Sequence, residues 1–129
     1  MIRMIIVEDE PLMNEYLAGC LEWNKFGILL CGVFFNGKAA YDFLQENEID
    51  IVVTDIKMPV MDGLTLISKL APVQPHLKFI IISGYNDFHM VKDAFKLGAT
   101  DYVLKTEFEP ETFQRLLTKL IANLSPTYE

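Results

Sequence analysis

Five short runs of branched apolar residues, separated by stretches of helical periodicity, constrain the fold of this chain more than any other feature. The runs are residues 4–7, 28–35, 51–53, 79–82 and 102–104. All but the second and the fifth are apolar almost without alternation, which is typical of strands buried on both faces of a parallel sheet. The sequence therefore predicts a sheet that is covered on both sides.

Amphipathic stretches lie between and after these runs. Apolar residues recur at helical spacing within residues 12–21, 39–44, 64–70, 91–95 and 113–124. Pro11 suits the first turn of a helix, and Gly98 suits the C-terminal cap of another. Five strands that alternate with five helices predict an α/β fold with a parallel sheet. Right-handed crossovers then place helices on both faces of that sheet.

Composition and charge narrow the possible functions. The chain has 129 residues, which suits one domain, and a formal net charge of -7 at pH 7. Domains that bind nucleic acid or anionic lipid are usually basic, so we expect this chain to bind neither by itself. No apolar run is long enough to span a membrane, and acidic residues 8–10 follow the apolar N-terminus too soon for a secretion signal. With two cysteines, which we expect to be reduced, the sequence indicates a cytoplasmic protein.

Polar residues follow four of the five predicted strands. Glu8 and Asp9 follow the first strand, and Asp55 follows the third. Ser83 follows the fourth and Lys105 the fifth. In open α/β sheets, ligands bind beyond the carboxyl ends of the strands, where the strand order reverses. With the order 2-1-3-4-5, the first and third strands are neighbours at that point, so we expect the five side chains to form one site.

Three carboxylates at one site require compensating positive charge. Two like charges roughly 4 Å apart repel by about 4 kcal/mol at an effective dielectric constant near 20. Mg²⁺ suits an oxygen cluster, because it accepts one or two carboxylates together with water and phosphate oxygens. Lys105 supplies a second positive charge, and Ser83 can donate a hydrogen bond to a phosphoryl oxygen. This set of residues predicts transfer of a phosphoryl group to Asp55 as an aspartyl-phosphate.

Four stretches of the sequence resemble the motifs of receiver domains from two-component response regulators. They are residues 6–11 (IVEDEP), 54–63 (TDIKMPVMDG), 83–88 (SGYNDF) and 98–105 (GATDYVLK), in the family's order and spacing. The resemblance covers about residues 2–124 and implies a flavodoxin-like fold with the strand order 2-1-3-4-5. It implies a receiver domain over residues 1–124, with residues 125–129 as a tail or the start of a linker to an absent effector domain.

The resemblance also implies which residues react and which bind the metal. Asp55 would accept a phosphoryl group from a sensor histidine kinase in a reaction that depends on Mg²⁺. Asp9 would contact the metal directly, and Glu8 would act through water. The carboxylate of Asp55 and the backbone carbonyl of Lys57 would be the other protein ligands.

A further implication is a switch made by Ser83, Tyr102 and Lys105. Ser83 would move toward the phosphate, which pairs with Lys105, and Tyr102 would turn inward. These movements would reshape the surface of the fourth helix, fifth strand and fifth helix, which would form a homodimer or release an attached domain. Residues 83–88 further resemble receivers that precede an AraC-type module, so DNA would be contacted only through a C-terminal domain absent from this chain. Such a protein is a phospho-acceptor that catalyses its own phosphotransfer and slow dephosphorylation, not an enzyme.

One position departs from the usual sequence of the family, and two others are positions at which the family sets the lifetime of the phosphoryl group. Thr106 follows Lys105 where receivers usually carry a cis proline. Because a cis bond before a non-proline residue costs about 2.5–4 kcal/mol, we expect a trans bond, with a shifted Lys105 or an altered start of the last helix. Lys57 and Tyr85 occupy the positions that set phosphate lifetime, and neither is well suited to orient a water. We therefore expect slow loss of the phosphoryl group.

Other interpretations of the same residues are open to comparison with the structure. Asp55 could cap a strand end, and Ser83 could cap a helix or lie in a turn. Glu8, Asp9 and Lys105 could be surface charges. An aspartyl-phosphate hydrolase is excluded because Lys57 stands where it needs a second aspartate, and a flavin site is excluded by the acidic loop 8–11. A degenerate receiver that binds proteins without being phosphorylated remains an alternative, because Glu8 and Thr106 both depart from the commonest pattern.

Overall fold

The computed structural model describes residues 1–84 and 88–124, and within them the strands form one parallel sheet. The strands are β1 (Ile2–Val7), β2 (Ile28–Phe34), β3 (Ile51–Asp55), β4 (Lys78–Ser83) and β5 (Asp101–Leu104). They are paired in the order β2-β1-β3-β4-β5, and each neighbouring pair is parallel. The predicted strand order and flavodoxin-like architecture are confirmed.

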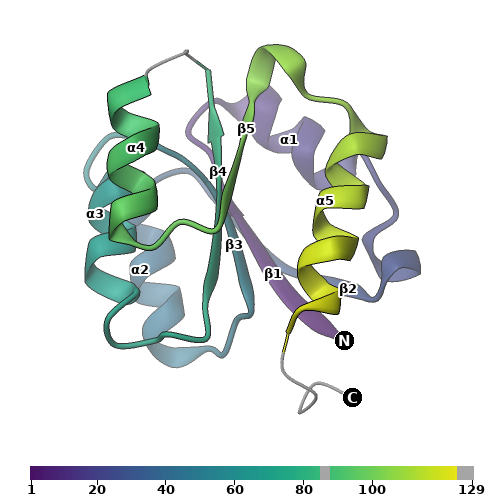
Figure 1. Cartoon of the computed structure of the whole chain (residues 1–129), viewed down its shortest axis with the longest axis horizontal. Coiled ribbons are helices and arrows are strands. Elements are labelled where there is room, and N and C mark those ends of the chain that lie inside the picture. The colour runs from purple at the N-terminus through teal and green to yellow at the C-terminus, as the bar shows by residue number, and fades with distance from the viewer. Residues whose placement is uncertain (85–87, 125–129) are drawn as a thin grey trace.

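Helices cover both faces of this sheet (Figure 1). The helices α2 (Gly37–Glu46), α3 (Gly63–Leu70) and α4 (Phe88–Leu97) lie on one face, and α1 (Pro11–Gly19) and α5 (Pro110–Ala122) lie on the other. Two short 3-10 helices, η1 (Trp23–Phe26) and η2 (Lys105–Glu107), precede β2 and follow β5. The sequence predicts the five α-helices but not the 3-10 turns, which are too short to show a repeating apolar pattern.

Successive side chains of the strands divide between two cores. In β1, Ile5 and Val7 pack with α2, α3 and α4, whereas Met4 and Ile6 pack with α1 and α5. All four side chains are at most 1% exposed. Burial on both faces of the sheet explains why near-continuous apolar runs mark these strands in the sequence.

The helix ends follow from local signals in the sequence. Pro11 is the first residue of α1, as expected, and Pro110 is the first residue of α5. Asp62 caps α3, because its Oδ1 accepts a 2.8 Å hydrogen bond from the backbone N–H of Thr65. Gly98 follows the last residue of α4 with a φ of +127°, a conformation that favours glycine.

The apolar pattern predicted for α1 is only partly buried. Leu17 is 1% exposed, but Leu12 is 82% exposed and Tyr16 45% exposed. The ring of Tyr16 meets that of Phe108 edge-on, with 5.7 Å between centroids. A helix on the surface of a sheet buries one stripe of side chains, so the second apolar row of α1 belongs to the protein surface.

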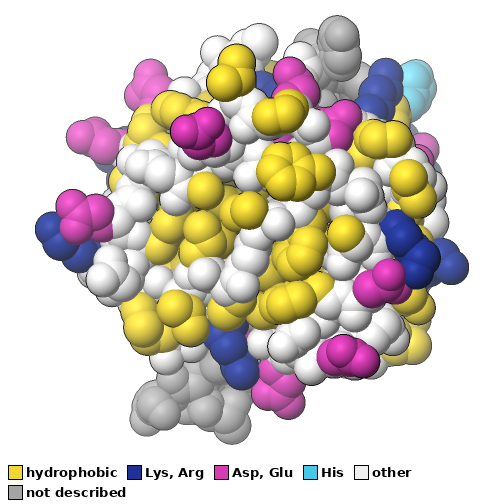
Figure 2. All heavy atoms as spheres, turned by 180° about the vertical axis from the view of Figure 1, so that it is seen from behind, with side chains coloured by type: hydrophobic (Ala, Val, Ile, Leu, Met, Phe, Trp, Pro, Cys, Tyr) yellow, Lys and Arg dark blue, Asp and Glu magenta, His cyan; other side chains and the backbone are white. Residues whose placement is uncertain are grey.

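The edge strand β2 also exposes apolar side chains. Leu29, Val33 and Phe35, in this strand and directly after it, are between 38% and 49% exposed. Figure 2 shows the molecule from behind, with hydrophobic side chains gathered near the centre of this face and many charged ones toward its rim. Only one side of an edge strand is paired within its own sheet, so this surface combines apolar side chains with unpaired backbone groups.

Two further expectations concern the cysteines and membranes. Cys20 and Cys31 are both free thiols, as expected, although each is half-buried rather than buried. In the part of the chain that the structure describes, no helix has the length and apolar character needed to cross a membrane.

Candidate functional site

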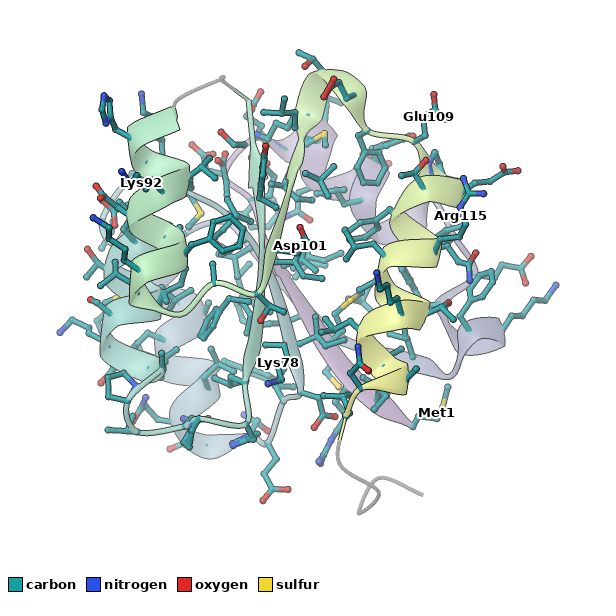
Figure 3. The ribbon with its side chains drawn as sticks, in the orientation of Figure 1. Met1, Lys78, Lys92, Asp101, Glu109 and Arg115 are labelled. Atoms are coloured by element: carbon teal, nitrogen blue, oxygen red, sulfur yellow. The ribbon has the colours of Figure 1, made fainter. Side chains whose placement is uncertain are left out.

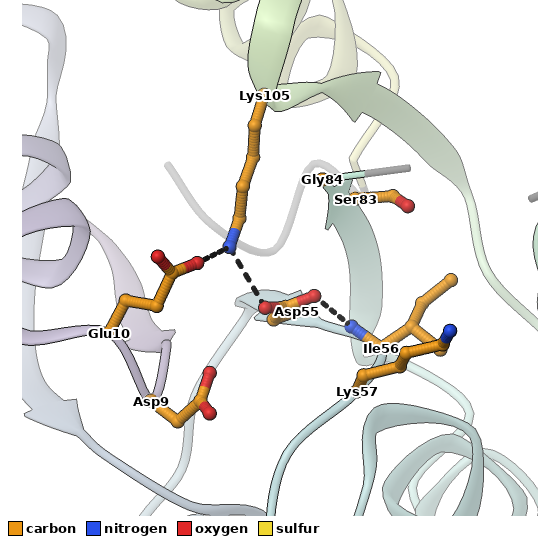
Figure 4. Close-up of a pocket in the computed structure, with 8 residues that line it drawn as sticks. All are labelled: Asp9, Glu10, Asp55, Ile56, Lys57, Ser83, Gly84 and Lys105. Carbon is orange, nitrogen blue, oxygen red and sulfur yellow. Dashed lines mark hydrogen bonds and ion pairs between the residues drawn. The ribbon is translucent and has the colours of Figure 1, made fainter. Parts of the chain in front are cut away.

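The carboxyl ends of the strands meet at one end of the sheet, the upper end in Figure 1. The strand register places Asp55 beside Ile82 and Ser83 beside Leu104. The residues at and after these strand ends therefore surround a pocket of about 210 Å³ (Figure 4). It is lined by Asp9, Glu10, Asp55, Ile56, Lys57, Ser83, Gly84 and Lys105.

Asp55, the last residue of β3, is fixed by contacts to both carboxylate oxygens. Its Oδ1 accepts a 2.7 Å hydrogen bond from the backbone N–H of Ile56, and its Oδ2 accepts one of 2.9 Å from Nζ of Lys105. The backbone N–H of Gly63 donates to the carbonyl of Ile56 over 2.7 Å. A Cβ at position 63 would clash with the carbonyl oxygen of Asp55, so glycine lets α3 begin directly against the backbone that carries this carboxylate.

Asp55 forms an acidic cluster with Glu8 and Asp9, which follow β1. One carboxylate oxygen of each residue lies within 4.8 Å of the others. Glu8 is 1% exposed, and its Oε2 accepts a 3.0 Å hydrogen bond from the backbone N–H of Glu10. The three acids thus meet as predicted, and Asp55 and Glu8 are buried rather than solvated surface charges.

The environment of Glu8 favours its protonated form. The pKa of Glu8 is raised to about 7, first because the carboxyl is buried and also because of the charge of Asp55. The hydrogen bonds and the positive charge that Lys105 and Glu10 supply act in the opposite direction. Glu8 Oε1 lies 2.6 Å from Nζ of Lys105, which makes the two groups an ion pair. The angles of this contact do not meet hydrogen-bond geometry, and no other described residue gives this oxygen a hydrogen bond.

Lys105 is the cationic centre of the site. Its Nζ lies 2.6 Å from Glu8 Oε1, 2.8 Å from Glu10 Oε1 and 2.9 Å from Asp55 Oδ2. Burial alone would lower the pKa of Lys105, but the three carboxylates outweigh it and raise this pKa above its usual range. A solvated surface lysine would not have these contacts, so that interpretation of Lys105 is wrong.

The bond that follows Lys105 is trans, as predicted for Lys105–Thr106. Around this bond the chain forms η2, which starts at Lys105 and ends at Glu107, before α5 begins at Pro110. Lys105 itself still reaches Asp55. Threonine at position 106 is therefore compatible with a lysine that reaches the carboxylate of Asp55.

The remaining predicted site residues are Ser83, Lys57, Tyr102 and Tyr85, and they differ in burial and in whether they line the pocket. Ser83 is the last residue of β4, is 5% exposed and lines the pocket. Lys57 lines the pocket with an exposed side chain. Tyr102 is 41% exposed, and its ring meets Phe95 edge-on at 6.0 Å. Tyr85 lies outside the described residues.

Sequence reasoning missed two residues of the site, Glu10 and Asn14. Glu10 binds Lys105 through its side chain and Glu8 through its backbone N–H. Asn14, which is 2% exposed, donates from Nδ2 to the carbonyls of Glu8 and Phe34, each over 3.0 Å, and so ties α1 to the ends of β1 and β2. The available signals were a third consecutive acid after β1 and a polar residue within an apolar helical pattern.

The donor set fits a hard divalent cation. Glu8, Asp9 and Asp55 offer only oxygen ligands, the type that Mg²⁺ prefers. Oε1 of Glu8 already faces a cationic group, because it lies 2.6 Å from Nζ of Lys105, and this contact shows that its position suits positive charge. Lys57 lines the same pocket. These residues could therefore hold Mg²⁺ beside the carboxylate of Asp55.

Comparisons with known proteins agree with this geometry. The chain is 38% identical to the transcriptional regulatory protein YesN of Bacillus subtilis over 96% of its own length, but spans only 33% of that relative. It is 33% identical to the chemotaxis protein CheY of Thermotoga maritima, covering 92% of this chain and 96% of CheY. The receiver domain of AraT, a response regulator from Geobacillus stearothermophilus, superimposes with a TM-score of 0.82 at 28% identity, covering 92% of this chain and 91% of that one.

The resemblance predicted from the four motifs is confirmed. The relatives include transcriptional regulators, in agreement with the expected output, while the chain spans only about a third of YesN. The family model for response regulator receiver domains matches residues 4–118. The chain therefore belongs to the receiver domains of two-component response regulators.

Proposed function

We propose that Asp55 accepts a phosphoryl group from a sensor histidine kinase and that the phosphorylated chain passes the signal to an output domain or a dimer interface. Receiver domains are signalling switches rather than enzymes in the classical sense. The single observation that carries the proposal is the position of Asp55. Its carboxylate borders a pocket, with a lysine on one oxygen and two other acids close by.

The proposed step is a displacement at phosphorus. An oxygen of Asp55 forms a bond to phosphorus, while the bond from phosphorus to the leaving group breaks. The leaving group, an imidazole of phosphohistidine or the carboxylate of a small acyl phosphate, departs with the electron pair. Lys105 and Ser83 border the same pocket, where an ammonium and a hydroxyl can stabilise charge on the phosphoryl oxygens. Because Oδ2 of Asp55 is paired with Lys105 beforehand, the lysine has to exchange this contact for the phosphoryl group.

The metal has a defined place in this proposal. Receiver domains bind Mg²⁺ at an acidic pocket, where it neutralises charge on the phosphoryl oxygens. Asp9, Asp55 and the backbone carbonyl of Lys57 are the proposed direct ligands, and Glu8 is proposed to act through water. Support comes from the proximity of the three carboxylates, which offer only oxygen ligands.

The proposed output surface is formed by α4, β5 and α5. On this face, Lys92 of α4 and Arg115 of α5 carry positive charge, and Asp101 of β5 carries negative charge (Figure 3). Phe95 and Tyr102 expose apolar rings on the same elements. A surface with charges of both signs around exposed aromatic rings suits a symmetric contact between two copies. Movement of Ser83 and Tyr102 on phosphorylation is proposed to control that contact.

The output and the lifetime of the signal are further parts of the proposal. Residues 1–124 are proposed as the receiver, and residues 125–129, which lie outside the described residues, as a tail or the start of a linker to an effector domain. The relative YesN, named as a transcriptional regulatory protein, is about three times as long, which supports a DNA-binding effector. Lys57 and Tyr85 are proposed to give slow loss of the phosphoryl group. A cytoplasmic location fits partnership with a kinase.

The alternative is a receiver that binds proteins without phosphorylation. It rested on the two departures at Glu8 and Thr106. Lys105 keeps its 2.9 Å contact with Asp55 despite Thr106, and Glu8 keeps a carboxylate in the cluster. Both observations favour a working phosphorylation site over the alternative.

Intact mass spectrometry tests the proposal. The protein is incubated with acetyl phosphate, with and without Mg²⁺, beside an Asp55→Asn variant. We expect a gain of one phosphoryl group on the wild type in the presence of Mg²⁺ and none on the variant. Wild-type protein that stays folded and gains nothing would support the interaction-only alternative instead.

A further inference from the structure

Resting on the proposed function, we propose that Glu10 is a positioning residue and charge barrier at the mouth of the site. It holds Lys105 before phosphorylation and disfavours small, highly charged phosphoryl donors. This role concerns the approach of the donor and the release of the lysine. It is separate from metal binding and from the attack by Asp55.

The contacts of Glu10 separate it from the other acids of the site. Its Oε1 lies 2.8 Å from Nζ of Lys105, while its backbone N–H donates to Oε2 of Glu8 over 3.0 Å. The Glu10 side chain is 67% exposed, whereas those of Glu8 and Asp55 are 1% and 10% exposed. Glu10 is therefore the outermost of the three carboxylates that bind the lysine, and a donor entering from solvent encounters its charge first.

Exposure also makes Glu10 the partner that Lys105 can leave most easily. A buried carboxylate that loses its cation keeps an uncompensated charge, which is costly. A carboxylate that is largely in water is solvated when the pair separates, so its ion pair is weak. When a phosphoryl group reaches Asp55, the contact with Glu10 is thus the one that Lys105 gives up at least cost.

The position of Glu10 before α1 does not explain where its carboxylate points. Glu10 occupies the N-cap position of this helix, but its side chain makes no capping hydrogen bond. The carboxylate is instead directed at Lys105 across the pocket (Figure 4). A purely helical role for Glu10 predicts no effect on the choice of phosphoryl donor, which gives a clear experimental distinction.

The experiment compares two small donors of different charge. Acetyl phosphate carries more negative charge than phosphoramidate at neutral pH, and both transfer a phosphoryl group to a carboxylate with loss of acetate or ammonia. Rates of phosphorylation are measured by intact mass for the wild type and Glu10→Gln. We expect Glu10→Gln to raise the rate with acetyl phosphate about three- to tenfold, and that with phosphoramidate less than about twofold. In 1 M salt, where the screening length falls to about 3 Å, the difference should largely disappear.

Two variants serve as matched controls. Glu10→Asp keeps the charge and should retain the donor preference of the wild type. Glu15→Gln changes the net charge equally, but Glu15 is an exposed residue of α1 that does not line the pocket, so its rates should not change. The Mg²⁺ affinity of each variant is first measured by calorimetry, so that all rates are compared at saturation.

The outcomes distinguish this inference from the proposed function. Wild-type labelling together with a shifted donor preference in Glu10→Gln supports the role of Glu10. Wild-type labelling with equal effects on both donors, or none, overturns the inference and leaves Asp55 as the acceptor. A wild type that takes a phosphoryl group from neither donor overturns the proposed function and the inference with it.

Discussion

Glu8 is a buried carboxylate whose charged form is disfavoured, so the free energy of unfolding should depend on pH. Its pKa is raised to about 7 in the folded protein, mainly by burial, and the usual value of 4.5 applies to the unfolded chain. A raised pKa means that the folded state binds the proton more tightly. The stabilisation from Glu8 is therefore fully present below about pH 4.5 and is lost as the pH rises through about 7.

Replacing Glu8 by glutamine removes this dependence on pH. We expect the free energy of unfolding of Glu8→Gln, relative to the wild type, to increase between pH 4.5 and 8 by an amount on the order of 3 kcal/mol. Urea denaturation in a metal chelator measures it, with Glu46→Gln, an exposed position, as the control. A constant difference between wild type and Glu8→Gln across this range would show that Glu8 is ionised normally.

Single residues were predictable from sequence where their chemistry is unusual for their place. Asp55, Lys105 and Ser83 could be found because polar side chains directly after apolar strands are conspicuous. The backbone conformation of Val60 could not be predicted, because a β-branched residue is not expected at a φ of +69°. The pKa of Glu8 was equally out of reach, because it depends on burial by segments far apart in the sequence.

At the scale of elements, Asn14 links α1 to the strand ends that carry the acids. Its two hydrogen bonds go to the carbonyls of Glu8 and Phe34. We expect Asn14→Ala to lower the free energy of unfolding by about 1–3 kcal/mol, because the buried carbonyl of Glu8 loses the Asn14 donor and the carbonyl of Phe34 keeps only the N–H of Glu8. We also expect weaker Mg²⁺ binding, because the loop of Glu8 and Asp9 is less well fixed.

A core variant separates these two effects of Asn14. Leu17 lies on the same helix and is 1% exposed, but it packs in the core and does not line the pocket. Leu17→Ala should destabilise the fold by about 2–5 kcal/mol. Calorimetric titration should nevertheless show that it binds Mg²⁺ more tightly than Asn14→Ala does. If both variants lost the same Mg²⁺ affinity, Asn14 would stabilise the fold in general and would have no specific role in positioning the metal ligands.

The elements themselves were largely predictable, and the exceptions have physical reasons. Strands buried on both faces give near-continuous apolar runs, so β1, β3 and β4 were found, although each predicted run is two residues shorter than the strand. Helical spacing alone did not show which apolar row of α1 is buried, because Leu12 and Tyr16 fit the same spacing as Leu17 but are exposed. The turn η2 was not predicted, because a 3-10 helix of three residues is too short to show a repeating apolar pattern.

At the scale of the whole molecule, the proposed switch connects the pocket to the α4–β5–α5 surface. We expect phosphorylated protein to dimerise more strongly than unmodified protein, as measured by analytical ultracentrifugation. Leu97→Asp, at the exposed end of α4, should abolish the dimer while leaving phosphorylation unchanged. Val73→Asp serves as the control, because it introduces the same charge at an exposed apolar position between α3 and β4 and should leave the dimer intact.

Phosphorylated protein that stays monomeric would contradict dimerisation through this surface. A dimer that survives Leu97→Asp but is lost in Val73→Asp would move the interface to another face. The overall architecture and the position of the site followed from sequence, because strand order and strand ends together determine where polar residues meet. The interface could not be predicted with equal detail, because exposed residues carry no periodic signal.

Chemical trapping of the phosphorylated residue tests the central claim most directly. Borohydride reduces an aspartyl-phosphate to homoserine with loss of phosphate, so the reacting residue is marked permanently. Protein treated with acetyl phosphate and Mg²⁺ is reduced, digested and sequenced by mass spectrometry. We predict homoserine at position 55, dependent on Mg²⁺. Homoserine at another aspartate, or a folded protein that yields none, would contradict the assignment of Asp55 as the phospho-acceptor.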